Sequence, residues 1–334
     1  MNVTCLLLII SLTMGLTNGN AQNSKTMQDQ KNPRLCKPEA GICETPNNNN
    51  KSISHRKASV QNKPVKIIYF TDPICSSCWG IESQLRKLKL EYGNTLEIEY
   101  RMGGLLKDWS YNSGDISKPS DVAHHWDEVS QYYDMPIDGD IWLEDPLMSS
   151  YPPSMAFKAA QLQDQEKAIL FLREIRELVF LKKKNITKWE HLEAAAAKVG
   201  LDQARFKADF EGKAKDLFLE DLKLGSELGV RGFPTLFFTN GNGQKELVYG
   251  AKPYSNFENA LLKIDPTAAK YDYDKNWFSV FSKYNSLTAK EFSDLTDVPR
   301  KAAENKLNEL TSQGHLEIYK TKNGDIWTLK TETH

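Results

Sequence analysis

Hydrophobic positions divide the chain into an apolar start, a polar arm and an ordered remainder. Residues 3–16 are predominantly apolar, whereas residues 23–64 are rich in Asn, Gln, Lys, Ser and Pro and show no hydrophobic periodicity. We therefore expect the arm to be mostly irregular. Order begins at Val65, where a β-branched and aromatic run through Phe70 predicts a buried strand.

The residues after this strand predict a βαβ unit. Ile81, Leu85 and Leu88 recur at helical spacing, and residues 96–100 alternate as a second strand. A long, mainly helical stretch then runs from about 121 to 228. It includes a helix expected to open with a capping box from Thr187 to Glu190.

Strand patterns return after the helical stretch. Residues 235–239 and 246–249 predict a β-hairpin, and Ser255 is expected to cap a last helix that ends at Ile264. The order of elements is therefore β-α-β, a helical insertion, and β-β-α. This order indicates one α/β domain over residues 65–265.

Residues 270–331 predict a separate α+β module. A helix is expected at about 277–284, a second opens with a capping box from Thr288 to Glu291, and Pro299 opens a third. Two short strands, at 316–319 and 326–329, follow the third helix. Three helices with a two-stranded wing are typical of a winged helix.

Composition narrows the function classes. The 334 residues include 40% hydrophobic and 26% charged side chains, which excludes global disorder and a polytopic membrane protein. Lys and Arg number 43 against 44 Asp and Glu, so no basic excess favours nucleic acid. The winged module mixes both signs of charge in the same way. We expect no nucleic-acid partner and favour docking as the role of this module.

The N-terminus leaves the cellular compartment open. Residues 1–22 form a candidate signal peptide, with the small residues Gly19 and Ala21 near a cleavage site, although no Lys or Arg precedes the apolar run. The run is shorter than the ~20 residues that span a bilayer, so no membrane span is expected in the mature chain. Export predicts a periplasmic or secreted protein, and a start at Met27 predicts a cytoplasmic one.

Two cysteines lie between the first strand and its helix. Cys75 and Cys78 are separated by two serines, and the positive end of a helix stabilises a thiolate. We expect Cys75 to be accessible and to attack, and Cys78, one turn onward, to resolve the mixed disulfide. The pair predicts thiol–disulfide exchange, which requires no cofactor.

Phe233 and Pro234 precede the third strand. A proline is tolerated there because no ladder N–H is needed. Held cis, Pro234 would bring the Phe233 backbone close to the dithiol and offer edge hydrogen bonds to an extended substrate. The alternative is an ordinary trans turn.

The polar arm holds a second cysteine pair, Cys36 and Cys43. Three interpretations remain open: an auxiliary structural disulfide, a redox pair that exchanges with Cys75 and Cys78, and a four-thiolate zinc site. His124 and His125 are adjacent, and neighbours on a helix diverge by about 100°, so we expect no metal site there.

These motifs resemble those of a known family. The segments TDPICSSCW at 71–79 and GVRGFPT at 229–235, with a helical insertion between them, resemble the DsbA family of thioredoxin-fold proteins, especially its FrnE and SpxH branches. The resemblance covers about 65–264 and implies a redox-active dithiol with Pro234 as the cis-proline. Serines replace the Pro-His dipeptide of strong oxidants, which favours a milder oxidoreductase or isomerase.

The fold prediction is a thioredoxin fold with a helical insertion between its βαβ and ββα halves, followed by the winged-helix-like module. The predicted function is thiol–disulfide exchange with thiol- or disulfide-containing protein substrates. One alternative is an adaptor, since the SpxH branch is implied to present a transcription factor to a cytoplasmic protease. A glutathione-dependent isomerase normally has a hydroxyl where Cys75 stands, which counts against it. A zinc-stabilised structural protein is the remaining alternative. The sequence leaves the substrate and the direction of electron flow open.

Overall fold

The computed structural model of the chain describes residues 36–37, 42–44, 63–110 and 117–330. All of the described residues belong to one compact unit. The candidate signal peptide and most of the polar arm lie outside the described residues. Within those residues, no helix is long and apolar enough to cross a membrane.

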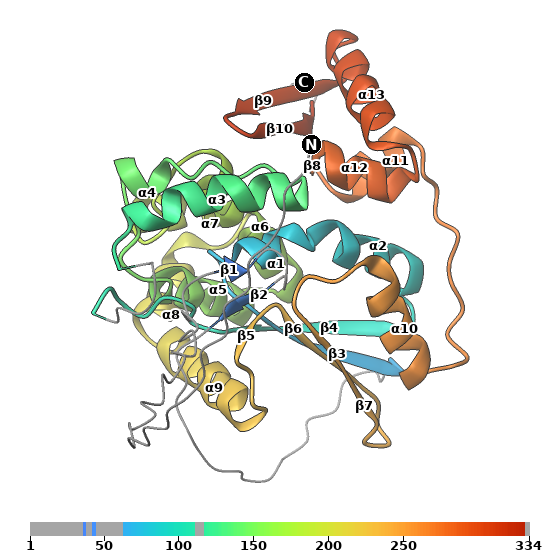
Figure 1. Cartoon of the computed structure of the whole chain (residues 1–334). Coiled ribbons are helices and arrows are strands. Elements are labelled where there is room, and N and C mark those ends of the chain that lie inside the picture. The colour runs from blue at the N-terminus through green and yellow to red at the C-terminus, as the bar shows by residue number, and fades with distance from the viewer. Residues whose placement is uncertain (1–35, 38–41, 45–62, 111–116, 331–334) are drawn as a thin grey trace, which may run out of the picture. The chain divides into compact units, whose positions relative to one another are not determined.

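A four-stranded mixed sheet forms the centre of the fold (Figure 1). Its order is β4-β3-β6-β7. Strand β3 (Val65–Thr71) is parallel to β4 (Leu96–Met102) and antiparallel to β6 (Thr235–Thr239), which forms a hairpin with β7 (Lys245–Tyr249). Layers cover both faces of β3, which explains its nearly continuous apolar run.

Helices complete both halves of the fold. Helices α1 (Ser76–Gly80) and α2 (Glu82–Tyr92) connect β3 to β4, and α10 (Tyr254–Ile264) follows the hairpin. The insertion contains α3 (Ser120–Tyr133), α4 (Ile141–Glu144), α5 (Tyr151–Gln163), α6 (Gln165–Leu181), α7 (Trp189–Lys198), α8 (Gln203–Glu211) and α9 (Ala214–Glu227). The predicted order of β-α-β, insertion and β-β-α is confirmed.

Two predicted helix caps are wrong. Helix α7 begins at Trp189 without a side-chain cap, because Thr187 instead donates its hydroxyl hydrogen to Asn185 at 2.6 Å. Helix α10 begins after Pro253, so Ser255 lies inside its first turn. The capping box at Thr288 is confirmed. Local turns that compete for a hydroxyl therefore decide which cap motifs form.

The C-terminal module has its own hydrophobic core, which includes Leu287, Leu295 and Leu307. Its elements are α11 (Trp277–Lys283), β8 (Ser286–Thr288), α12 (Ala289–Thr296), α13 (Arg300–Ser312), β9 (Leu316–Thr321) and β10 (Gly324–Leu329). The sheet has the order β8-β10-β9, so the prediction of two strands missed β8. The three residues of β8 are too few for a sequence pattern. The predicted domain boundary near residue 265 stays a prediction.

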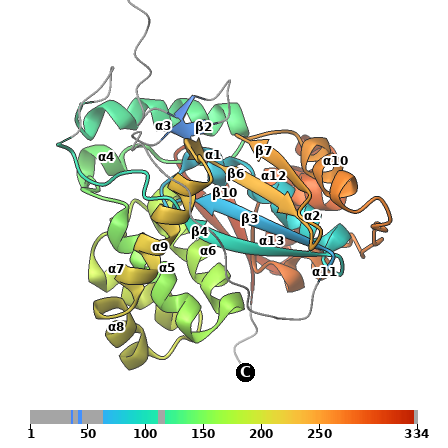
Figure 2. The ribbon, with the colours of Figure 1, turned by 90° about the horizontal axis from the view of Figure 1, so that it is seen from below.

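The polar arm contains backbone order that the sequence did not predict. Strands β1 (Cys36–Lys37) and β2 (Ile42–Glu44) form an antiparallel pair, and β2 pairs with β5 (Gly232–Phe233). The sequence did not predict order at these five residues, and the expectation of a mostly irregular arm stays a prediction because most of the arm lies outside the described residues. Figures 1 and 2 both draw β2 beside α1, in agreement with the contact between these two elements.

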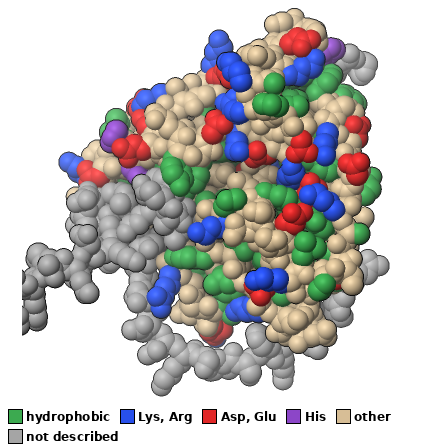
Figure 3. All heavy atoms as spheres, turned by 45° about the vertical axis from the view of Figure 1, so that its right-hand side comes forward, with side chains coloured by type: hydrophobic (Ala, Val, Ile, Leu, Met, Phe, Trp, Pro, Cys, Tyr) green, Lys and Arg blue, Asp and Glu red, His purple; other side chains and the backbone are tan. Residues whose placement is uncertain are grey.

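Charges of both signs mix on the face of the molecule that Figure 3 shows. On the face in Figure 3, Lys and Arg lie interspersed with Asp and Glu and with scattered apolar side chains. This mixing agrees with the formal net charge of -1 for the whole chain. Such a surface has little long-range attraction for a polyanion.

Candidate functional site: a buried dithiol beside an arm strand

The dithiol lies where β3 ends and α1 begins. Cys75 is the N-cap of α1, and its Sγ accepts a hydrogen bond from the backbone N–H of Cys78 at 3.1 Å. Both residues are free cysteines. The two sulfurs therefore belong to a single helical turn, the arrangement that exchange between them requires.

Both thiols are fully buried. Cys75 and Cys78 each have 0% relative exposure, so the prediction of an accessible Cys75 is wrong for this arrangement of the chain. The backbone offers a physical reason, because β2 lies against α1 while it pairs with β5. The sequence left an exchange between the arm cysteines and the dithiol open, but it did not predict an arm strand at this place.

The pKa values of the two thiols are shifted in opposite directions. Burial, together with the hydrogen bond and charge of Cys78, raises the pKa of Cys75 well above its ordinary value. For Cys78, burial opposes ionisation, but the Cys75 thiol and the Arg176 guanidinium, with smaller contributions from Thr71 and Tyr69, lower the pKa. In this buried state the negative charge is more stable on Cys78 than on Cys75.

Arg176 is a site residue that sequence reasoning missed. It reaches from α6 to the end of β3, where it donates hydrogen bonds to Thr71 Oγ1 at 2.6 Å and to the carbonyl of Asp72 at 3.2 Å. It also pairs with Glu82 at 3.1 Å and is almost fully buried. The only sequence sign was an arginine next to the apolar stripe of its helix, about 100 residues from the cysteines.

Asp72 holds together the turn that carries Cys75. Its carboxylate accepts hydrogen bonds from the N–H groups of Ile74 at 3.0 Å and Leu105 at 2.8 Å, and from the Ser150 hydroxyl at 2.8 Å. Burial raises the pKa of Asp72 to about 6, although these bonds oppose the shift. A buried acid with this pKa changes its charge within the physiological range.

Phe233 and Pro234 lie at the same end of the sheet as the dithiol. The peptide bond between them is cis, and the next residue, Thr235, pairs with Phe70 near the end of β3. The Phe233 ring is buried against Gly103, where an added Cβ would lie 1.7 Å from a ring carbon. Its backbone pairs with β2, with Phe233 opposite Cys43. Phe233 therefore packs through its ring and pairs through its backbone.

Asp221 positions the loop that supports Phe233. This fully buried carboxylate of α9 contacts Arg101 at 2.8 Å, Lys158 at 2.8 Å and the N–H of Met102 at 3.0 Å. It holds the end of β4 directly before Gly103. The sequence did offer a sign of this role, because Asp221 occupies an apolar position of its helix.

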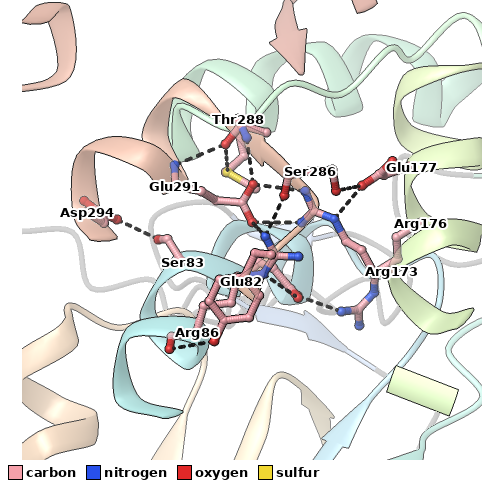
Figure 4. A network of polar contacts seen from close by, with 12 residues as sticks. Glu82, Ser83, Arg86, Arg173, Arg176, Glu177, Ser286, Thr288, Glu291 and Asp294 are labelled. Atoms are coloured by element: carbon pink, nitrogen blue, oxygen red, sulfur yellow. Dashed lines mark hydrogen bonds and ion pairs between the residues drawn. The ribbon is translucent and has the colours of Figure 1, made fainter. Parts of the chain in front are cut away.

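A buried charge network joins the C-terminal module to the helices around the dithiol (Figure 4). Arg173 of α6 makes a bidentate pair with Glu291 of α12, at 2.8 and 3.0 Å, and Arg86 of α2 approaches the same carboxylate at 3.1 Å. Burial alone would raise the pKa of Glu291, but Arg173 and then Arg86 lower it. The Arg173 guanidinium also lies 4.4 Å from the ring centre of Trp79, the residue after Cys78.

The described residues contain no group of three His, Cys, Asp or Glu side chains that could hold a metal. His124 is exposed and pairs with Glu128 at 3.1 Å. His125 instead lines a small pocket together with Trp109 and Trp126. The side chains of Cys36 and Cys43 lie outside the described residues, so the zinc alternative stays a prediction.

Comparisons with known proteins agree with this fold. A family profile described as Thioredoxin matches residues 69–259, and the chain belongs to this family. The chain is also 33% identical over 307 residues to the ClpXP adapter protein SpxH of Halalkalibacterium halodurans, which covers 90% of this chain and 99% of that protein. The protein of the same name from Shouchella clausii is 32% identical over 298 residues, which cover 87% of this chain and 95% of that protein.

A solved structure shares the fold. A Nitrosomonas europaea protein, proposed to be a protein disulfide isomerase, has a TM-score of 0.52 and 23% identity. The match covers 61% of this chain and 97% of that protein. The two SpxH proteins match a larger share of this chain.

Proposed function

We propose that the protein is an adapter of the SpxH type, which binds a protein partner and presents it to the ClpXP protease. The observation that carries this proposal is the match to an SpxH protein over 90% of this chain and 99% of the relative, a length that must include at least part of the C-terminal module. An adapter must bind two proteins, and a thioredoxin fold joined to a second module provides surfaces for both. The proposal requires the cytoplasmic location that a start at Met27 predicts.

A reconstituted degradation assay tests the adapter function. The full chain is added to purified ClpXP and the transcription factor that SpxH adapters present, and loss of the factor is followed over time. We expect degradation to become severalfold faster. The Cys75→Ser/Cys78→Ser double variant should retain this effect, because partner binding does not require the thiols. An unchanged degradation rate with the wild-type chain would contradict the proposal.

A second candidate function is thiol–disulfide exchange with protein substrates. The two cysteines on one helical turn, at the end of the sheet that carries the cis-proline, support it. Ser76 and Ser77 favour a mild oxidoreductase or isomerase. In an insulin reduction assay with dithiothreitol, the full chain should shorten the lag before precipitation, and Cys75→Ser should abolish the effect. A wild-type chain that leaves the lag unchanged would argue against this function.

A further inference from the structure

We propose that Cys43 of the arm is an internal redox partner of Cys75, and that Cys36 is the second thiol of this partner pair. The proposal rests on the thiol–disulfide exchange named above as the second candidate function. It assigns to β2 the position of an extended substrate strand at the dithiol.

The pairing of β2 with β5 brings Cys43 to the edge of the sheet beside the cis-proline. Strand β2 pairs antiparallel with β5, and Cys43 lies opposite Phe233, the residue before the cis-proline. The same strand lies against α1, the helix that begins directly after Cys75. An extended protein substrate that adds a strand to this edge would take the same place. The arm therefore brings a cysteine of the chain itself to the edge where a substrate cysteine would be presented.

The pairing of β1 with β2 places the two arm cysteines opposite one another. Cys36 lies directly opposite Cys43 across the β1–β2 pair. Directly opposed residues of antiparallel strands have Cα atoms about 4.5–5.5 Å apart. Disulfides join Cα atoms about 4.4–6.8 Å apart, so this backbone spacing suits a bond between the two cysteines. The arm pair can therefore act as a complete two-electron couple.

The exchange balances without a further reagent. Cys75 passes its proton to the Cys78 thiolate and attacks Sγ of Cys43, which breaks the Cys36–Cys43 bond and releases Cys36 as a thiolate that takes up a proton. Cys78 then loses its proton and attacks Sγ of Cys75, and Cys43 leaves and is protonated. Two electrons pass from the active-site pair, which becomes a disulfide, to the arm disulfide, which becomes a dithiol; of the two protons on the arm thiols, one comes from the active-site pair and one from solvent. The reverse direction uses the same steps.

Trapping the mixed disulfide tests the proposal in the full chain. In a Cys5→Ser background, the Cys36→Ser/Cys78→Ser variant retains only Cys43 and Cys75. The matched control, Cys43→Ser/Cys78→Ser, retains only Cys36 and Cys75. Both proteins are incubated with reduced and oxidised glutathione, quenched with an alkylating reagent, digested without reductant and mapped by mass spectrometry.

We expect a Cys43–Cys75 disulfide in the first variant, at a yield about tenfold above the Cys36–Cys75 product of the control, because β2 raises the local concentration of the Cys43 thiol at the site. Glutathione adducts on Cys75 with equal cross-linking in the two variants would overturn the assignment of Cys43 and leave thiol–disulfide exchange intact. A Cys75 that forms neither product would overturn both.

Discussion

At the residue scale, the dithiol depends on buried polar groups that come from distant parts of the chain. Cys75, Cys78 and Pro234 were predictable because their spacing and their positions beside strands follow from the local sequence. Arg176 was not, and Asp221 showed only as a charged residue at an apolar position of its helix, because the polar contacts of both residues join parts of the chain about 100 residues apart and form only after folding. Local patterns therefore predicted the chemistry of the site but not the groups that position it and set its charge.

The raised pKa of Asp72 should make the unfolding free energy depend on pH. Its folded pKa of about 6 exceeds the ordinary value of 3.8, so the folded state holds the proton more tightly. The resulting stabilisation is fully present below pH 3.8 and is lost as the pH rises through about 6. The difference in unfolding free energy between wild type and Asp72→Asn should therefore fall by about 3 kcal/mol between these limits.

Urea unfolding of both proteins from pH 3.5 to 7.5 measures this difference. Other titrating groups are common to the two proteins and cancel. At pH 7 we still expect the variant to be less stable, because Ile74 and Leu105 donate to different oxygens of the carboxylate and an asparagine amide has only one oxygen to accept them. A difference that is independent of pH would show that Asp72 does not titrate in this range.

We expect a side chain at position 103 to clash with Phe233, the residue before the cis-proline. In Gly103→Ala, the new Cβ would overlap the buried Phe233 ring, so the ring and its backbone must move. We expect a loss of about 1–3 kcal/mol in unfolding free energy. The control Gly241→Ala adds a methyl group to open space and should change stability little. Phe233→Leu, combined with Gly103→Ala, should recover part of the loss; a purely additive double variant would contradict this contact.

At the element scale, hydrophobic periodicity predicted the long elements and missed the short ones. β3, α2 and β4 carry patterns of their own, whereas β8 and β2 have three residues each and gain their order from pairing with β10 and β5. The partner of β2 lies almost 190 residues away in the sequence. Such elements can be recognised only after the rest of the fold is known.

Glu291 attaches α12 to α6 and α2, so we expect its substitution to lower the unfolding free energy. Glu291→Gln removes one of two carboxylate partners of each arginine, since Arg173 keeps Glu177 at 2.7 Å and Arg86 keeps Glu82 at 3.6 Å. We expect a loss of about 2–3 kcal/mol in unfolding free energy. The control Glu309→Gln removes an exposed carboxylate that pairs with Lys306 and should change the unfolding free energy far less. Equal losses in the two variants, measured by urea unfolding, would show that the buried network does not stabilise this attachment.

At the scale of the whole molecule, the arm strand and the dithiol should be coupled through access to Cys75. Because β2 has neighbours on both sides, a proline at position 43 removes a possible ladder hydrogen bond and disfavours the strand, whereas Cys43→Ser leaves the backbone able to pair. Loss of about 1 kcal/mol of pairing makes the open state about fivefold more populated. We therefore expect iodoacetamide to alkylate Cys75 about fivefold faster in Cys43→Pro than in Cys43→Ser, measured in the Cys5→Ser background by mass spectrometry.

Equal rates would mean that β2 does not limit access and that the burial of the thiols arises from the thioredoxin fold itself. A faster rate in the proline variant would instead mean that an adapter partner or a protein substrate must displace the arm before it reaches the dithiol.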